Sequence, residues 1–255
     1  MMPVGVPRAK TGAPLANHGA PTIVLNPVLM SIDDAKRSAA RAALAELPES
    51  GTIGLGSGST AKIFIDEVGA LVHAGRKLTG VPTSDGSRAQ AKALGIPLLS
   101  DDGPWEIEVT VDGADEVDAE LNLIKGGGGA QTREKMVNYA SKRNVIIVDE
   151  TKISTRLGTT WPVPIEVLRF AHLQTRRLLE ALGAPKQRHR PSGEPWITDA
   201  GNLLYDLTVG QIADPAALDR AIRAVPGVVE TGLFVGRADL VLVAGSAGVT
   251  RLTRR

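Results

Sequence analysis

The residues with the most evident capacity for chemistry lie in VTVDGADEVDAELNLIKGGGGAQTREK, residues 109–135. An apolar strand is expected to end in two carboxylates, Asp112 and Asp115. Lys125 then precedes four consecutive glycines, and Glu134 falls in the first turn of the helix that follows. Glycine backbone can approach a ligand closely and point several N–H groups at it. The stretch could therefore surround one small anionic substrate, although a flexible surface loop beside an acidic turn would need no ligand.

A second anion site is expected at GSGST, residues 56–60, between a short strand and a helix. Free N–H groups and the helix dipole favour a phosphate there, and Ser57, Ser59 and Thr60 add hydroxyl donors. The loop also satisfies the loose dinucleotide pattern G-x-G-x-x-A, but no acidic residue follows at the expected distance, and no P-loop lysine is present. A phosphate cradle fits better than a nucleotide site; a tight turn without a ligand is the alternative.

Two more lysines fall where they could reach an anion. Lys36 lies in the second turn of a helix that Ser31 is expected to cap. Lys152 comes just after a continuous apolar strand, at the carboxyl edge where α/β sheets bind ligands. Taken alone, each could be a solvated surface lysine.

The composition excludes several other chemistries. The chain has 255 residues and a formal net charge of +1, so bulk attraction to nucleic acid or to a membrane is not expected. It has no cysteine, and its four histidines are scattered, which argues against a metal or thiolate site. No apolar run approaches the ~18 residues of a membrane span. We expect no metal and no cofactor.

Strands and helices alternate through the first part of the chain, which predicts a doubly wound parallel sheet of the α/β class. The expected strands are residues 52–55, 78–83, 96–99, 109–111 and 144–148, and the expected helices are residues 32–47, 61–68, 85–94 and 132–142.

The pattern changes from about residue 162. The order β-α-β-β-α-β over residues 163–234 is that of a ferredoxin-like unit. The apolar run 238–244 then returns to the first sheet. We therefore predict a Rossmann-like domain of residues 31–158 and 236–255, with a smaller ferredoxin-like α+β lid of residues 159–235 inserted in it.

Residues 1–30 differ from the rest, with five prolines, two cations and no acid. They carry neither a long apolar core nor a cleavage pattern, so we expect a cytoplasmic protein without a secretory signal. We predict a disordered tail, and Met30, which directly precedes a good helix start, as a candidate true start.

From about Ser31 to its end, the chain resembles the type A ribose-5-phosphate isomerases. The resemblance rests on the order and spacing of GSGST, DGADE, KGGGGAQTREK, DETK and PGVVETGLF. It implies interconversion of ribose 5-phosphate and ribulose 5-phosphate in the non-oxidative pentose phosphate pathway, without metal or nucleotide. It also implies a Rossmann-like sheet with a smaller lid, and a homodimer or homotetramer.

The resemblance also assigns residues. Glu134 matches the proton acceptor of the family. Ser57 stands where a threonine is common and Gly129 where an alanine is common, and neither departure removes a needed group. The residues that match the substrate-contacting segments of the family are Lys36, Ser57, Gly58, Ser59, Thr60, Asp112, Gly113, Ala114, Asp115, Lys125, Gly126, Gly127, Gly128 and Lys152.

Aldose–ketose isomerisation moves a proton between C2 and C1 through an enediolate, so it needs a base and donors to the growing charge. Glu134 is the candidate base and Lys125 the natural electrophile. Asp112 and Asp115 could orient sugar hydroxyls and assist ring opening. Glu134 could instead be an ordinary first-turn glutamate, and Asp115 could simply pair with Lys125.

Two other classes of protein could also carry these residues. A sugar-phosphate-sensing regulator would bind the same ligand without turnover, but such proteins usually carry a DNA-binding helical module, which residues 1–30 are too short and proline-rich to form. The interpretation as a nucleotide-dependent oxidoreductase rests only on the weak glycine pattern of residues 56–61. Turnover of ribose 5-phosphate without added nucleotide or metal would leave only the isomerase.

Overall fold

The computed structural model describes Met1 and residues 30–254. The tail predicted over residues 1–30 therefore lies almost entirely outside the described residues. Met30 itself is partly buried and packs against the main core.

A six-stranded sheet forms the centre of the protein, with the strand order β13-β12-β6-β3-β1-β2. Five of its strands are parallel: β1 (Ser50–Leu55), β2 (Lys77–Pro82), β3 (Val109–Asp112), β6 (Asn144–Asp149) and β12 (Leu240–Gly245). The antiparallel strand β13 (Gly248–Thr253) closes one edge. The predicted α/β class with a Rossmann-like sheet is confirmed.

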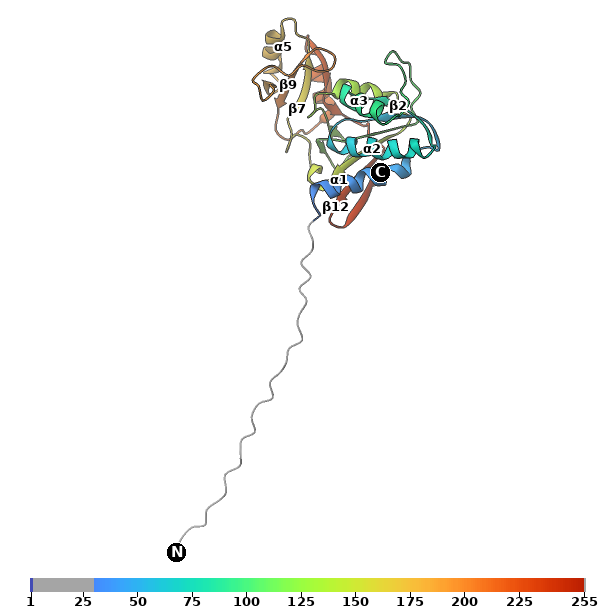
Figure 1. The fold of residues 1–255 in the computed structure, drawn as a ribbon. Helices are drawn as coiled ribbons and strands as arrows, with labels where there is room; N and C mark the ends of the chain where they lie inside the picture. The colour runs from blue at the N-terminus through green and yellow to red at the C-terminus, as the bar shows by residue number, and fades with distance from the viewer. Residues whose placement is uncertain (2–29, 255) are drawn as a thin grey trace.

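One face of this sheet packs against α1 (Ile32–Ala43), α2 (Ser59–His73) and α3 (Asp85–Ala93). Figure 1 shows α1 and α2 side by side. Helix α1 begins at Ser31, whose side chain accepts a hydrogen bond from the Asp34 N–H. Ala35 and Ala39 repeat at helical spacing and are buried against the sheet, whereas Ile32 is 56% exposed.

The opposite face is covered by α4 (Gln131–Tyr139) and by a small sheet of order β11-β5-β4. In this sheet, β4 is Glu116–Val117, β5 is Leu123–Ile124 and β11 is Leu233–Phe234. The side chain of Val137 in α4 approaches the backbone of Gly54, where an added Cβ would come within 2.8 Å of it. Helix α4, which carries Glu134, is thus packed directly on the central sheet.

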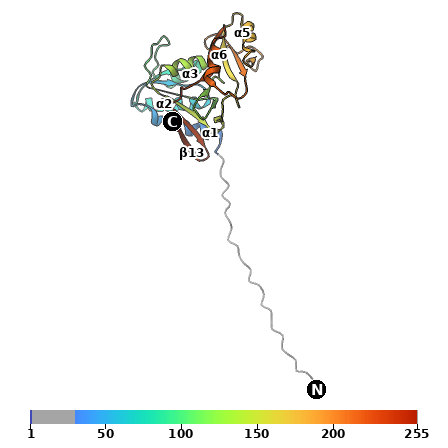
Figure 2. The same cartoon turned by 180° about the vertical axis from the view of Figure 1, so that it is seen from behind.

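A separate four-stranded antiparallel sheet has the order β10-β7-β9-β8. Its elements in chain order are β7 (Val163–Val167), α5 (His172–Leu179), β8 (Ala184–Gln187), β9 (Leu203–Thr208), α6 (Pro215–Arg223) and β10 (Val228–Thr231). Asp214 caps α6 and Pro215 stands at its first position, as expected. Figure 2 shows α5 at the far end of this unit and α6 nearer to the central sheet. The domain boundaries at 158/159 and 235/236 stay a prediction.

Two expectations about strands were wrong. Residues 96–99 form no strand; only a single bridge joins Gly80 to Leu98. The last strand of the ferredoxin-like order, which was expected to run to residue 234, is divided at Gly232 into β10 and β11. An added Cβ at Gly232 would lie 2.2 Å from the Lys125 carbonyl oxygen, so glycine is needed at this point. Its second half joins β5 rather than β7. The edge strand β13 was not expected.

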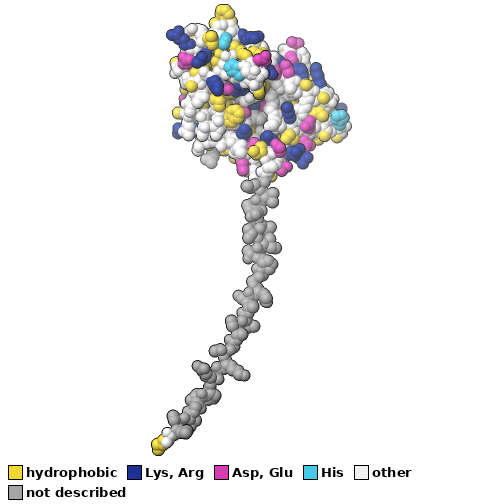
Figure 3. Space-filling view, turned by 60° about the vertical axis from the view of Figure 1, so that its left-hand side comes forward, with side chains coloured by type: hydrophobic (Ala, Val, Ile, Leu, Met, Phe, Trp, Pro, Cys, Tyr) yellow, Lys and Arg dark blue, Asp and Glu magenta, His cyan; other side chains and the backbone are white. Residues whose placement is uncertain are grey.

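Two short 3-10 helices complete the elements, at Leu44–Glu46 and Glu150–Lys152. The first replaces the last turn of the helix expected over residues 32–47. Figure 3 shows acidic and basic side chains interspersed over one face of the protein, in keeping with a formal net charge of +1.

Candidate active site

The loops after β1, β3 and β6 meet at one edge of the central sheet, because these three parallel strands are neighbours. They enclose a cavity of about 230 Å³ together with α1 and the glycine loop. Every residue predicted for the site lines this cavity, except Asp112: Lys36, Ser57, Gly58, Ser59, Thr60, Gly113, Ala114, Asp115, Lys125, Gly126, Gly127, Gly128, Glu134 and Lys152.

The loop after β1 leads directly into the N-terminus of α2. Gly58 has φ +92°, which favours glycine, and the backbone N–H groups of the first helical turn have no partner within the helix. The Ser57 hydroxyl shares a hydrogen bond of 2.7 Å with the Thr83 hydroxyl. Such an N-terminus attracts an anion through free donors and the helix dipole.

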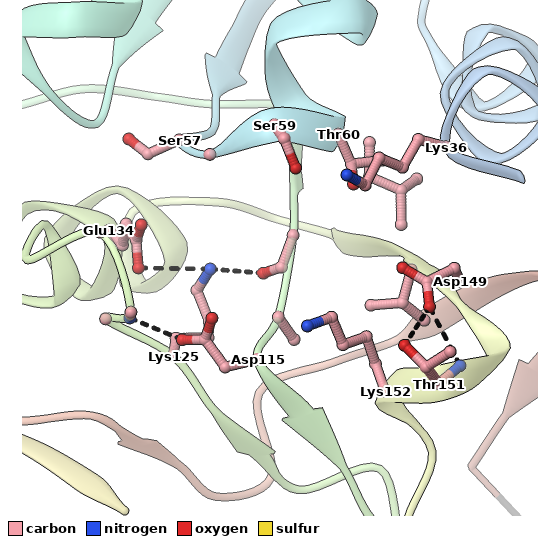
Figure 4. A pocket seen from close by; sticks show the side chains of 18 of the residues that line it. Lys36, Ser57, Ser59, Thr60, Asp115, Lys125, Glu134, Asp149, Thr151 and Lys152 are labelled. Carbon is pink, nitrogen blue, oxygen red and sulfur yellow. Dashed lines mark hydrogen bonds and ion pairs between the residues drawn. The ribbon is translucent and has the colours of Figure 1, made fainter. Parts of the chain in front are cut away.

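Two lysines flank this helix start. Figure 4 shows the side chains of Lys36 and Lys152 pointing into the cavity from opposite elements, with Ser59 and Thr60 close to Lys36. Lys36 lies 3.7 Å from an Asp33 oxygen, and the Lys152 ammonium lies 5.4 Å from the centre of the Trp161 ring. Their positive charge and the α2 N-terminus together favour a phosphate at this end of the cavity.

A buried ionic cluster occupies the other end of the cavity (Figure 4). The Lys125 ammonium lies 2.9 Å from Asp112 Oδ2 and 3.3 Å from Glu134 Oε2, and it donates a 2.5 Å hydrogen bond to the Gly113 carbonyl. The side chains of the three charged residues are only 4–6% exposed. One cation is therefore shared by two carboxylates away from bulk water.

Asp112 lies beneath the cavity rather than in its wall. Its Oδ1 atom accepts hydrogen bonds from the N–H groups of Ser57 and Gly113, at 2.9 and 2.7 Å. The close approach of this carboxylate explains Gly56, where an added Cβ would lie 2.2 Å from Asp112 Oδ1. Asp112 thus ties the anion cradle to Lys125.

Asp115 does not form the ion pair with Lys125 that the sequence left open. Its Oδ2 atom accepts a 2.6 Å hydrogen bond from the Gly127 N–H instead. Burial raises the pKa of Asp115, although this hydrogen bond and the nearby cations oppose the shift. The carboxyl faces the cavity and anchors the glycine loop.

Burial also raises the pKa of Glu134 above its usual range, and the carboxylates of Asp112 and Asp115 add to the shift, while Lys125 opposes it. For Lys125, burial alone would lower the pKa, but the adjacent carboxylates outweigh it and hold the pKa above the ordinary value. Glu134 is thus a better proton acceptor than an exposed glutamate, beside a permanent positive charge.

Some cavity residues were missed by the sequence reasoning: Ile32, Ile147, Val148, Asp149 and Thr151. Asp149 is 3% exposed and accepts hydrogen bonds from both the N–H and the hydroxyl of Thr151. The sequence did contain a signal for these two polar residues, because Asp149 ends the apolar strand β6 and Thr151 comes just after it, at the ligand-binding edge of the sheet.

Among residues 30–254, no group of three or more metal-ligating side chains could hold a metal ion. None of the described helices is long and apolar enough to cross a membrane.

A protein with this fold and this cavity is of the class that binds a small phosphorylated molecule beside a buried proton-transfer group. The comparison with known families is more specific. The sequence model of Ribose 5-phosphate isomerase A (phosphoriboisomerase A) matches residues 79–248. The chain belongs to this family.

Curated relatives match along almost their whole length. The ribose-5-phosphate isomerase A of Nitrobacter hamburgensis is 45% identical over 233 residues, which are 89% of this chain and 100% of the relative. That of Thermomicrobium roseum is 44% identical over 227 residues, which are 88% and 96% of the two chains.

Solved structures of ribose-5-phosphate isomerases are also similar to this chain. A D-ribose-5-phosphate isomerase in complex with phospho-erythronic acid has a TM-score of 0.85 and 38% identity, covering 88% of this chain and 100% of the other. The ribose 5-phosphate isomerase A of Methanocaldococcus jannaschii has a TM-score of 0.83, 38% identity and the same coverage.

Proposed function

We propose that this protein is an aldose–ketose isomerase that interconverts ribose 5-phosphate and ribulose 5-phosphate. The observation that carries the proposal is the division of one cavity into two ends. Glu134 and Lys125 form a buried pair at one end, and Lys36, Lys152 and the α2 N-terminus provide positive charge at the other. A phosphorylated pentose has the same division, with its carbonyl at one end and its phosphate at the other.

The reaction then needs only a proton transfer. The Glu134 carboxylate removes the proton from C2 of the open-chain aldose, and the C2–H electron pair forms the C1–C2 double bond of an enediolate. The C1=O π electron pair moves to O1 in the same step. The protonated Glu134 then returns the proton to C1, while the O2–H proton passes to O1 and the C2=O bond of the ketose forms. Lys125 stabilises the negative charge that develops on the substrate oxygen. No carbon–carbon bond and no carbon–oxygen σ bond is broken.

The remaining acids have supporting parts in this proposal. Asp112 orients Lys125, because its two oxygens bind the ammonium and the backbone of the anion cradle. Asp115, which faces the cavity, accepts hydrogen bonds from sugar hydroxyls and assists opening of the cyclic sugar. The phosphate at Ser57–Thr60 positions the reacting carbons through binding energy remote from them.

The ligand of a solved relative supports the same use of the cavity. That isomerase is in complex with phospho-erythronic acid, a phosphorylated sugar acid. Such a molecule combines a phosphate with an anionic group at its far end, which is the charge distribution of a phosphorylated enediolate.

The test is incubation of the pure protein with ribose 5-phosphate alone. The appearance of a ketose without added nucleotide or divalent ion supports the proposal. Binding of the sugar phosphate without turnover would favour a regulator instead, and a requirement for a nicotinamide nucleotide would favour an oxidoreductase. Unphosphorylated ribose is the matched control, because it keeps the reacting carbons and lacks the phosphate.

A homodimer or homotetramer and a cytoplasmic location are further parts of this proposal. The oligomeric state rests on the family resemblance, and light scattering of the purified protein tests it.

A further inference from the structure

An arginine from the four-stranded sheet contacts the glycine loop of the cavity. Arg188 directly follows β8, and its Nη1 atom donates hydrogen bonds to the carbonyl oxygens of Gly126 and Gly127, both at 2.9 Å. Its Nε and Nη2 atoms donate to the two oxygens of Asp206 in β9, the first at 2.8 Å. The side chain is 14% exposed. One planar guanidinium thus joins a carboxylate of the second sheet to two loop carbonyls.

These two carbonyls determine where the next two N–H groups point. In a trans peptide, the C=O and the following N–H point in opposite directions. The Gly126 carbonyl shares its peptide plane with the Gly127 N–H, which donates to Asp115 Oδ2 at 2.6 Å. The Gly127 carbonyl shares its plane with the N–H of Gly128, an exposed residue that lines the cavity. By binding both carbonyls, Arg188 fixes both planes.

The loop cannot hold this conformation through its own side chains. Gly126 and Gly129 have φ values of +103° and +78°, and an added Cβ at Gly127 would lie 2.5 Å from Asp115 Oδ1. These conformations and close approaches favour glycine, and glycine loses more conformational entropy on ordering than any other residue. One hydrogen bond lies within the loop, from the Gly129 N–H to the Gly126 carbonyl at 2.9 Å, and it leaves the Gly127 carbonyl unbound. Contacts from outside the loop supply the rest of the order.

We propose that Arg188, oriented by Asp206, is a positioning residue of the isomerase: it fixes the peptide planes of the glycine loop so that the Gly127 N–H holds Asp115 and the Gly128 N–H faces the substrate. This inference rests on the proposed function. Lysine would not replace arginine here, because only the planar fork can bind a carboxylate bidentately and two carbonyls at once.

The test is Arg188→Gln, which keeps a polar side chain but loses the fork and the charge. A loop displaced by a fraction of an ångström to an ångström lowers turnover by ~10–10²-fold. We expect kcat to fall by that order while KM stays close to the wild-type value, because the phosphate cradle at Ser57–Thr60 is untouched. Arg188→Lys should recover only part of the loss.

Two further variants separate positioning from general stability. Asp206→Asn leaves Arg188 in place but weakens its orientation, so it should lower kcat less, and its effect should not add to that of Arg188→Gln. Arg76→Gln is the matched control. Arg76 also donates to a backbone carbonyl, that of Leu47, and lies near a carboxylate, that of Glu49, but it does not contact the cavity. It should leave kcat unchanged.

A readout independent of activity completes the test. In protein labelled with ¹⁵N-glycine, Arg188→Gln should shift or broaden the amide signals of Gly127 and Gly128, and Arg76→Gln should not. Added guanidinium, at concentrations too low to unfold the protein, should restore part of the turnover of Arg188→Ala.

Two results would overturn the inference. Unchanged glycine amide signals in Arg188→Gln would do so even if the wild-type protein is an isomerase. A rise in KM at constant kcat would do the same, because the residue would then act on binding alone. If Arg188→Gln alters the glycine signals but the wild-type protein does not turn over ribose 5-phosphate, the proposed function is wrong and the inference about the loop is not.

Discussion

The substitution Glu134→Gln tests the centre of the proposed mechanism. It keeps the size and shape of the side chain but leaves no carboxylate to accept the C2 proton. A positioned general base contributes ~10²–10⁴-fold, which corresponds to about 3–5 kcal/mol of transition-state stabilisation. We expect turnover to fall by at least this order, and exchange of the C2 proton with solvent to vanish with it.

The same substitution should stabilise the protein at neutral and alkaline pH. Burial raises the pKa of Glu134, so the folded state binds its proton more tightly than the unfolded state does. The free energy of unfolding therefore falls as pH rises from the unfolded pKa of ~4.3 to the folded pKa, by about 1.4 kcal/mol per unit of difference. The variant avoids that loss because its side-chain amide does not ionise.

The assay pairs turnover of ribose 5-phosphate with thermal unfolding from pH 5 to pH 9, and with binding of phospho-erythronic acid. The variant should bind this ligand, and its melting temperature should exceed that of the wild type by a margin that grows with pH. Glu230→Gln is the matched control, since Glu230 also pairs with a buried lysine, Lys135 at 2.8 Å, but does not line the cavity. It should keep most of the turnover.

One outcome would refute this reasoning directly. If Glu134→Gln retains more than about a tenth of the wild-type turnover, the loss is smaller than a general base supplies. The proton acceptor would then have to be sought at Asp112 or Asp115. A melting temperature below that of the wild type at pH 8 would show that the ion pair with Lys125 outweighs the cost of burying the Glu134 charge.

Three further predictions concern other parts of the chain. Replacing Ser59 and Thr60 by alanine removes hydroxyl donors but keeps the N–H groups of α2, so ribose 5-phosphate should bind more weakly and the preference over ribose should shrink; an unchanged preference in competition assays would place the phosphate elsewhere. Gln131 is fully buried, and neither polar atom of its amide has a hydrogen-bond partner among the described residues. Gln131→Leu should therefore raise the free energy of unfolding by ~1–3 kcal/mol in denaturant titrations, and a decrease would mean that the amide is satisfied. Turnover should survive exhaustive chelation, and a loss on EDTA treatment that a divalent ion restores would contradict the proposed metal-free chemistry.

Much of the site could be predicted because its parts are local patterns. A strand that ends in Asp112-Gly-Ala-Asp115, a glycine loop after Lys125 and a hydroxyl-rich loop before α2 each occupy a few consecutive residues. The alternation of strands and helices then predicts that these loops lie at one edge, since parallel strands share their carboxyl ends. The family resemblance assigned the roles that spacing alone left open.

Only the tertiary structure decided how these groups contact one another. In the structure Lys125 forms an ion pair with Asp112, and Asp115 accepts a hydrogen bond from the Gly127 N–H. These partners depend on the direction in which each side chain points, which the order of residues in the sequence does not give. It also divided the strand expected to end at residue 234. The division lies at Gly232, where the backbone of Lys125 approaches too closely for a Cβ atom.

The sequence by itself determined the chemistry available: an acid, a lysine, flexible backbone and an anion cradle, in a fixed order along the chain. The tertiary structure determined their energetics. Burial raises the pKa of Glu134, and Arg188 reaches the glycine loop across more than 60 residues of sequence. Desolvation and long-range hydrogen bonds arise only when separate elements pack together, so no local pattern of residues could carry them.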